Sequence, residues 1–147
     1  MKTCTRNAFS LTMITTGLAL SLSCGAVVAD VVAVVSANSP LTELSRNQIA
    51  NLFLGNTSMQ VDGGPVMPID MAVGTSLRDE FYTSYAGKSP AQIRSHWSKL
   101  IFTGRGQPPK EAASSRDLKK LIAENPRAIG YLDPGMIDTS VRALRSP

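Results

Sequence analysis

The chain contains few of the residue types on which most catalytic and metal centres depend. Its 147 residues include one histidine and two cysteines, Cys4 and Cys24. Both cysteines precede residues 30–147, which therefore form no disulfide, bind no metal through thiolates and provide no cysteine nucleophile. A zinc site is not expected from His96, because protein zinc sites use three or four protein ligands. The sequence also lacks the G-x-S-x-G turn of serine hydrolases. We therefore expect a protein that is not an enzyme and that needs no cofactor.

Long runs of one charge are also absent. The full chain carries 15 basic and 11 acidic residues. Lys2 and Arg6 lie in the first 29 residues, so residues 30–147 retain 13 basic against 11 acidic residues, a net charge of +2. A nucleic-acid-binding domain usually concentrates Lys and Arg on one face or in one run. Nucleic acid is therefore not an expected partner.

The first 29 residues have the organisation of a secretory signal peptide. Lys2 and Arg6 provide a basic start, an apolar stretch follows over 11–22, and small residues fill 26–29. Such a segment is removed on export, here after Ala29. A lipid anchor on Cys24 is the alternative. No later apolar run is long enough to span a bilayer. Residues 30–147, 118 in number, are enough for one domain with a hydrophobic core.

Alternating helix and strand patterns predict an α/β fold. The β-branched run at 31–35 is typical of a strand buried on both faces, as in parallel sheets. Ser45 and Gln48 form a capping-box pair that begins a helix ending at Gly55. Turn residues at 62–64 predict a hairpin. The same patterns predict helices over 75–87, 89–104 and 114–125, a strand at 128–132, a turn at 133–135 and a last strand within 140–144.

The stretch 68–81 organises these predictions, because it combines a strand end, a short turn and a helix start. Gly74 permits positive φ, and Thr75 is a favourable N-cap whose oxygen can accept a backbone N–H. Leu77, Phe81 and Tyr85 recur on one face of the helix. A helix start has unpaired N–H donors and partial positive charge. The turn can therefore either cap its own helix or bind an anion.

Arg78 and Arg105 have two interpretations each. Arg78 can bind an anion, or it can contact Tyr82 or pair with a neighbouring carboxylate. Arg105, between two glycines, suits either a phosphate contact or a solvated loop. Trp97 is most simply a core residue, since it shares a helix face with Ile93 and Ile101.

Three segments carry a resemblance to a known family. The segment Leu41–Gly55, the Asp62-Gly63-Gly64-Pro65-Val66-Met67-Pro68 hairpin and Asn125-Pro126-Arg127-Ala128-Ile129-Gly130-Tyr131 are similar, in order and spacing, to motifs of the periplasmic phosphate-binding proteins of ABC importers. The resemblance implies one lobe of that type-II binding fold, over residues 30–147. It implies a mixed, mostly parallel sheet with helices on both faces.

The resemblance also implies a binding site. The family grips phosphate with an Arg after the hairpin and with a Ser-Gly-Thr helix start. Gly74 and Thr75 match that start, whereas Val73 replaces the serine and Asp70 occupies the region of the arginine. A carboxylate at Asp70 would repel phosphate unless it is neutralised. The length matches one lobe of the two-lobed family, as in its short single-lobe relatives.

The resulting prediction is a periplasmic, non-catalytic solute-binding protein. We expect it to bind inorganic phosphate or a similar oxyanion through Gly74, Thr75, Ser76 and Arg78, in connection with ABC-type uptake and its membrane subunits. The alternative is an interaction module. In that case the exposed inter-lobe face docks a partner protein or a second copy without binding a ligand.

Overall fold

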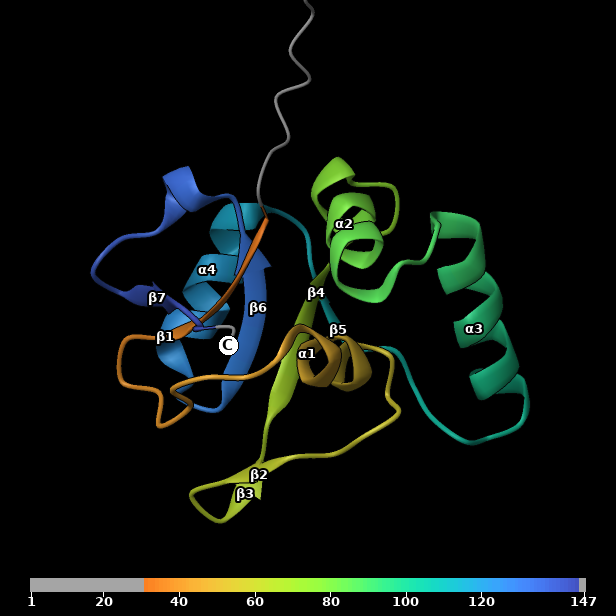
Figure 1. The fold of residues 1–147 in the computed structure, drawn as a ribbon, viewed down its shortest axis with the longest axis horizontal. Helices are drawn as coiled ribbons and strands as arrows, with labels where there is room; N and C mark the ends of the chain where they lie inside the picture. The colour runs from red at the N-terminus through yellow and green to blue at the C-terminus, as the bar shows by residue number, and fades with distance from the viewer. Residues whose placement is uncertain (1–30, 146–147) are drawn as a thin grey trace, which may run out of the picture.

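A five-stranded sheet runs through the centre of the protein in this computed structural model, which describes residues 31–145. The predicted signal peptide and Cys24 lie outside the described residues. The sheet has the order β5-β4-β6-β1-β7 (Figure 1). Its strands are β1 (Val32–Ser36), β4 (Met67–Met71), β5 (Lys110–Ala112), β6 (Ala128–Leu132) and β7 (Val141–Ala143). β4 runs parallel to β5 and β6, and β1 runs antiparallel to β6 and β7. Four of the five strands therefore point the same way, and the predicted mixed, mostly parallel sheet is confirmed.

Helices cover both faces of the sheet, as predicted. Successive side chains of a strand point to opposite faces of the sheet. Two neighbouring residues of β6 therefore show which helices cover each face. A Cβ at Gly130 would overlap Ile122 of α4 (Ser115–Glu124), whereas the Tyr131 ring stacks on Phe81 with the centroids 4.0 Å apart. Phe81 ends α2 (Ser76–Phe81), which continues as a π-helix, η1 (Tyr82–Ala86), beside α1 (Arg46–Phe53).

Strand β1 differs from the prediction in one respect. Val34 and Val35 are fully buried, so the expected burial on both faces is confirmed. The expected parallel pairing is wrong, because β1 is antiparallel to both of its neighbours. A β-branched run indicates that both faces of a strand are covered, but it does not indicate the direction of the strand relative to its neighbours.

The capping box predicted at Ser45 is confirmed. Ser45 and Gln48 form a complete capping box at the start of α1, and Ser89 and Gln92 form another at the start of α3 (Pro90–Phe102). The hairpin consists of β2 (Gln60–Val61) and β3 (Gly64–Pro65), joined by Asp62 and Gly63 at φ values of 49° and 72°. Two central residues with positive φ are typical of the type I′ turn that hairpins favour. A 3₁₀-helix, η2 (Pro134–Met136), occupies the predicted turn near the C-terminus.

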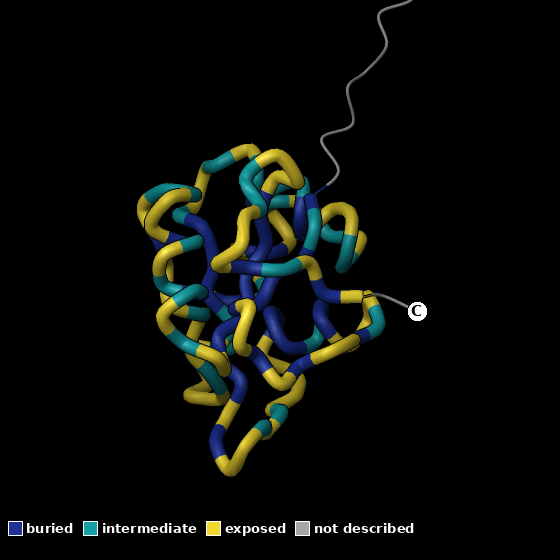
Figure 2. Tube along the Cα trace, turned by 90° about the vertical axis from the view of Figure 1, so that its left-hand side faces the viewer, coloured by how far each residue is buried: buried dark blue, intermediate teal, exposed yellow. Residues whose placement is uncertain are grey.

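The buried residues lie in the sheet and on the helix faces turned toward it (Figure 2). Helix α3 stands apart from this core at the side of the molecule (Figure 1). Its Ile93 and Trp97 are buried as predicted, whereas Ile101, expected on the same apolar face, is 55% exposed. Within residues 31–145, no helix combines the length and apolar character that crossing a membrane requires.

Candidate functional site

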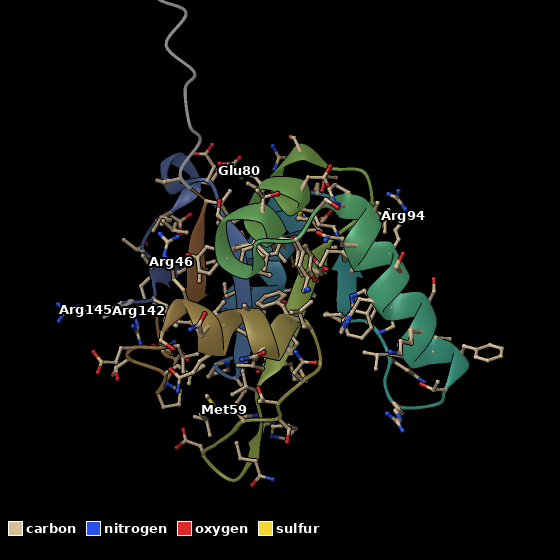
Figure 3. All side chains as sticks on the ribbon, turned by 45° about the vertical axis from the view of Figure 1, so that its right-hand side comes forward. Arg46, Met59, Glu80, Arg94, Arg142 and Arg145 are labelled. Carbon is tan, nitrogen blue, oxygen red and sulfur yellow. The ribbon has the colours of Figure 1, made fainter. Side chains whose placement is uncertain are left out.

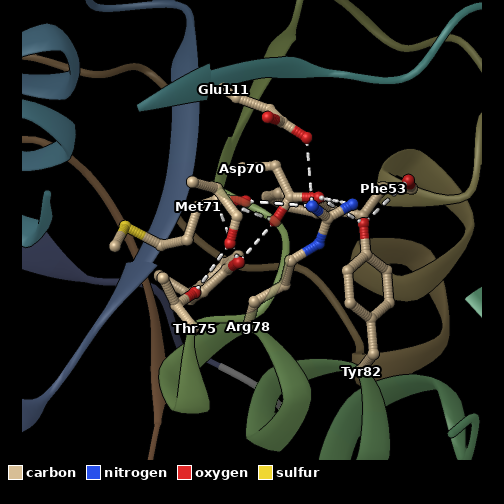
Figure 4. A network of polar contacts seen from close by, with 9 residues as sticks. Phe53, Asp70, Met71, Thr75, Arg78, Tyr82 and Glu111 are labelled. Atoms are coloured by element: carbon tan, nitrogen blue, oxygen red, sulfur yellow. Dashed lines mark hydrogen bonds and ion pairs between the residues drawn. The ribbon is translucent and has the colours of Figure 1, made fainter. Parts of the chain in front are cut away.

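A buried carboxylate, Asp70, lies near the end of β4 and is surrounded by hydroxyl donors. Its side chain is fully inaccessible to solvent. The Tyr82 hydroxyl donates to Oδ2 at 2.8 Å, the Tyr131 hydroxyl donates to Oδ1, and the Met71 N–H donates to Oδ1 at 2.9 Å (Figure 4). A buried charge is tolerated only when it is paired and hydrogen-bonded. This carboxylate meets both conditions.

Arg78 provides the charge that pairs with Asp70. Its guanidinium Nη2 lies 3.2 Å from Asp70 Oδ2, and Nη1 lies 3.0 Å from Glu111 Oε1 on β5. Nη1 also donates to the Met71 carbonyl at 3.2 Å, and the guanidinium lies 5.7 Å from the centre of the Tyr82 ring. Arg78 is only 5% exposed. Both the contact with Tyr82 and the ion-pair alternative considered for Arg78 are therefore present, and Asp70 is neutralised.

The pKa shifts follow from this burial. Burial raises the pKa of Asp70, while the hydrogen bond from Tyr131 and the Arg78 charge act in the opposite direction. Burial, together with the charge of Asp70, raises the pKa of both Tyr82 and Tyr131 well above its ordinary range. The two hydroxyls therefore stay protonated and keep donating to the carboxylate. The hydrogen bonds and ion pairs that link Asp70 to Arg78, Tyr82 and Tyr131 form a buried network, which attaches α2 and η1 to the sheet.

The turn before α2 is open to solvent. Gly74 has φ of 90° and is exposed, and no other atom would contact a Cβ placed on it. Thr75 occupies the N-cap position as predicted, but its hydroxyl donates to the Ala72 carbonyl at 3.0 Å and accepts no N–H of the helix. The predicted side-chain cap is therefore wrong. The amides of Ser76 and Leu77 donate to no atom of residues 31–145.

A cavity of about 280 Å³ adjoins this turn. Of the four predicted site residues, Gly74 and Arg78 line it, whereas Thr75 and Ser76 do not. The opposite wall comes from α3. Its cavity-lining residues include Arg94, Trp97, Ser98 and Ile101. The charges around the cavity are balanced, with Arg78 and Arg94 against Asp79 and Glu111.

Arg94 and Glu111 were not among the predicted site residues. Arg94, Trp97, Ser98 and Ile101 follow one another at i, i+3, i+4 and i+7, and such a spacing places side chains on one helix face. That spacing could have identified Arg94. Glu111 lies on a three-residue strand that the sequence patterns did not predict, so its place beside Arg78 could not have been found.

A larger cavity of about 540 Å³ lies on the other side of Trp97. Its walls are mainly apolar and include Leu52, Val66 and Leu121, and none of the predicted site residues lines it. The second wall of this cavity is the proline loop that precedes β5, with Pro108 and Pro109.

The remaining candidates lie elsewhere. His96 Nε2 is 2.8 Å from the Leu54 carbonyl oxygen, so the ring attaches α3 to the end of α1. Arg105 is exposed and lines neither cavity. Across residues 31–145, no three His, Cys, Asp or Glu side chains come close enough together to hold a metal ion.

The fold is similar to that of several solved phosphate-transport proteins. A protein from Clostridium perfringens described as a phosphate ABC transporter substrate-binding protein, solved with bound phosphate, aligns with a TM-score of 0.61 at 22% identity, over 79% of this chain and 44% of its own. An ABC-type phosphate transport receptor from Vibrio cholerae aligns at 0.51 and 20% identity, over 79% and 45%. PstS from Borrelia burgdorferi aligns at 0.52 and 14% identity, over 79% and 46%.

These similarities are structural. No protein-family model matches the chain, and no curated protein matches it by sequence. At such identities the likeness shows the fold, and the chain spans less than half the length of the proteins just named.

Proposed function

We propose that the protein is a non-catalytic, periplasmic solute-binding protein whose ligand is a small oxyanion, phosphate first, bound in the cavity beside Gly74. The observation that carries the proposal is the meeting of the open Gly74 turn with two arginines, Arg78 and Arg94, around one cavity. The fold shared with phosphate-binding proteins of ABC transporters supports it, and a link to ABC-type uptake is part of the proposal.

The binding contacts follow from the local chemistry. The unpaired amides of Ser76 and Leu77 and the hydroxyl of Ser76 offer neutral donors at the turn, whereas the Thr75 hydroxyl already donates to the Ala72 carbonyl. Arg94 is exposed on α3 and supplies a second positive charge at the cavity. Charge-assisted hydrogen bonds contribute about 1.5 to 3 kcal/mol each. Since acids also line the cavity, we expect weak binding, on the order of millimolar to tens of micromolar.

Glu111 determines how much of the Arg78 charge reaches the ligand. Its carboxylate occupies Nη1 of Arg78 and is itself 44% exposed at the cavity. An incoming oxyanion competes with this carboxylate for the same donor. The pair is partly exposed, so its contribution is about 1 kcal/mol at most.

Calorimetric titration of residues 30–147 with phosphate, sulfate and arsenate tests the proposal. We expect heat of binding with phosphate in the wild type and a loss of that heat in Arg94→Gln. Glu111→Gln should bind phosphate more tightly, by up to about fivefold. Asp138→Asn makes the same change of charge at a remote salt bridge with Lys119 and serves as the control. Absence of heat at millimolar phosphate in both wild type and Glu111→Gln would refute the proposal.

A second candidate is the interaction module, in which a partner protein or a second copy covers the cavity face. Val73 and Ile101, which are 60% and 55% exposed, both line the cavity and favour this candidate, because exposed apolar side chains that gather in one place are typical of an interface. Light scattering after size exclusion distinguishes the two candidates. A dimer that gives no heat with any of the three anions would favour the module.

A further inference from the structure

The last turn of α3 and the loop after it form an exposed apolar tip flanked by two basic residues. Phe102 is 92% exposed and Ile101 is 55% exposed, and all residues from 101 to 105 are exposed. Lys99 and Arg105 stand three residues before and three residues after Phe102, and both are exposed. We call residues 99–105 the α3 tip.

The charge of the chain segment that contains the α3 tip is strongly one-sided. From Phe81 to Lys110 the chain contains no Asp or Glu, but it contains five basic residues, Lys88, Arg94, Lys99, Arg105 and Lys110. The rest of residues 30–147 then carries 8 basic and 11 acidic residues, since 13 − 5 is 8. None of the five basic residues forms a salt bridge within residues 31–145. This segment is therefore a cationic element on an otherwise acidic domain.

The tip projects from the part of α3 that is attached to the core. Ile93 and Trp97 are buried, His96 bonds to the end of α1, and Leu100 is the last residue of the helix that packs against the core. Phe102 lies five residues beyond Trp97, about 7.5 Å further along the axis. Figure 3 shows α3 at the outer side of the molecule, with Arg94 pointing outward from it. Nothing among the described residues covers the tip.

We propose that the α3 tip docks the protein on an anionic phospholipid surface. Adjacent residues of a helix point about 100° apart, so Ile101 and Phe102 present apolar surface in two directions and do not form one compact anchor for a shaped pocket. A lipid interface accepts apolar side chains without a shaped pocket, and basic side chains beside them reach the headgroups. The one-sided charge is complementary to anionic lipid. Ile101 of the tip also lines the proposed oxyanion cavity, but the inference does not require that an anion binds there.

Vesicle co-sedimentation of residues 30–147 tests the inference, because this segment contains the whole described fold and omits the predicted signal peptide, whose apolar residues could bind lipid independently of the tip. We expect binding to phosphatidylcholine vesicles that contain phosphatidylglycerol, weakened by salt, and little binding to pure phosphatidylcholine. Lys99→Gln with Arg105→Gln should weaken binding about thirtyfold. Phe102→Ser should weaken it about tenfold or more.

Matched controls distinguish the effect of the tip residues on vesicle binding from the effects of net charge and of non-specific apolar contacts. Arg116→Gln with Lys120→Gln removes the same charge from exposed positions of α4. Met67→Gln removes an exposed apolar side chain outside the cationic segment. Both controls should bind within about twofold of the wild type. In Phe102→Trp, the added indole should show a blue-shifted emission with the anionic vesicles alone.

Three results would overturn the inference. These are equal binding to both kinds of vesicle, equal losses in the tip and α4 charge variants, and no binding to anionic vesicles. If anionic vesicles are not bound, but a specific protein binds residues 30–147 and loses that binding in the tip variants, the tip is a protein-docking surface.

Discussion

The buried network beneath α2 and the tip of α3 differ in the burial and pairing of their charged and aromatic side chains. In the network, Asp70 and Arg78 are buried and paired, and Phe81 is fully inaccessible to solvent. At the tip, the basic side chains are exposed and Phe102 is 92% exposed. A buried charge must be paired for the chain to fold, whereas an exposed, unpaired one contributes little to stability. The network therefore serves the fold, and the tip is available for contact with other molecules.

The largest expected effect comes from removing one buried charge. Asp70→Asn preserves the shape of the side chain but leaves the inner side of the Arg78 guanidinium without its anion. Breaking a buried pair on one side costs about 3 to 5 kcal/mol. Urea denaturation followed by circular dichroism measures the loss. Asp138→Asn breaks the exposed pair with Lys119 and should leave the unfolding midpoint unchanged. A loss below about 1 kcal/mol for Asp70→Asn would contradict the structural role of the pair.

A smaller effect is expected from alkaline pH. The pKa of Tyr82 and of Tyr131 is raised in the folded protein by burial and by the charge of Asp70. The unfolded chain releases these two protons near pH 10 and the folded protein retains them. Their contribution to stability is therefore complete below about pH 10 and is lost as the pH rises further. Each tyrosine should lower the free energy of unfolding by up to about 1.4 kcal/mol per pH unit.

Urea denaturation at a series of alkaline pH values measures this slope. Tyr82→Phe should remove the contribution of one tyrosine and give a shallower slope than the wild type. If the wild type and Tyr82→Phe show the same slope, Tyr82 does not retain its proton in the way proposed.

The smallest effect is expected at the tip. Phe102→Ala removes an exposed ring and should change the free energy of unfolding by no more than about 0.5 kcal/mol. Phe81→Ala makes the same chemical change where the ring stacks on Tyr131, and should cost about 3 to 5 kcal/mol. Thermal or urea unfolding of both variants compares the two regions directly. Similar losses in the two variants would show that the tip supports the fold after all.

Most local features were predictable from the sequence, because their causes lie within a few residues. The side-chain cap at Thr75 is the exception, since the Thr75 hydroxyl donates to the Ala72 carbonyl instead. The capping boxes of Ser45 and Ser89 each need only the residue three positions later. The hairpin needs only Asp62 and Gly63 at its turn. Strand β6 was predicted with its observed bounds, since its apolar run lies between clear breakers.

The arrangement of the candidate site was not predictable, because its causes lie far apart in the chain. Arg78 reaches Asp70 eight positions earlier and Glu111 thirty-three positions later, and the second partner depends on β5 pairing with β4. β5 has only three residues, two of them charged, and shows no strand pattern. Ile101 shares a helix face with Trp97, but the core ends before reaching it.

The position of β1 between β6 and β7 has a consequence for how the chain acquires its structure. Val32 pairs with Leu132, a hundred residues further along, and Val34 pairs with Ala143. Contacts of such long range make folding slow, because a large loop must close before they stabilise anything. The centre of the sheet therefore forms only when nearly all of the described chain is present. We expect folding in a single late, cooperative step, without an early N-terminal intermediate.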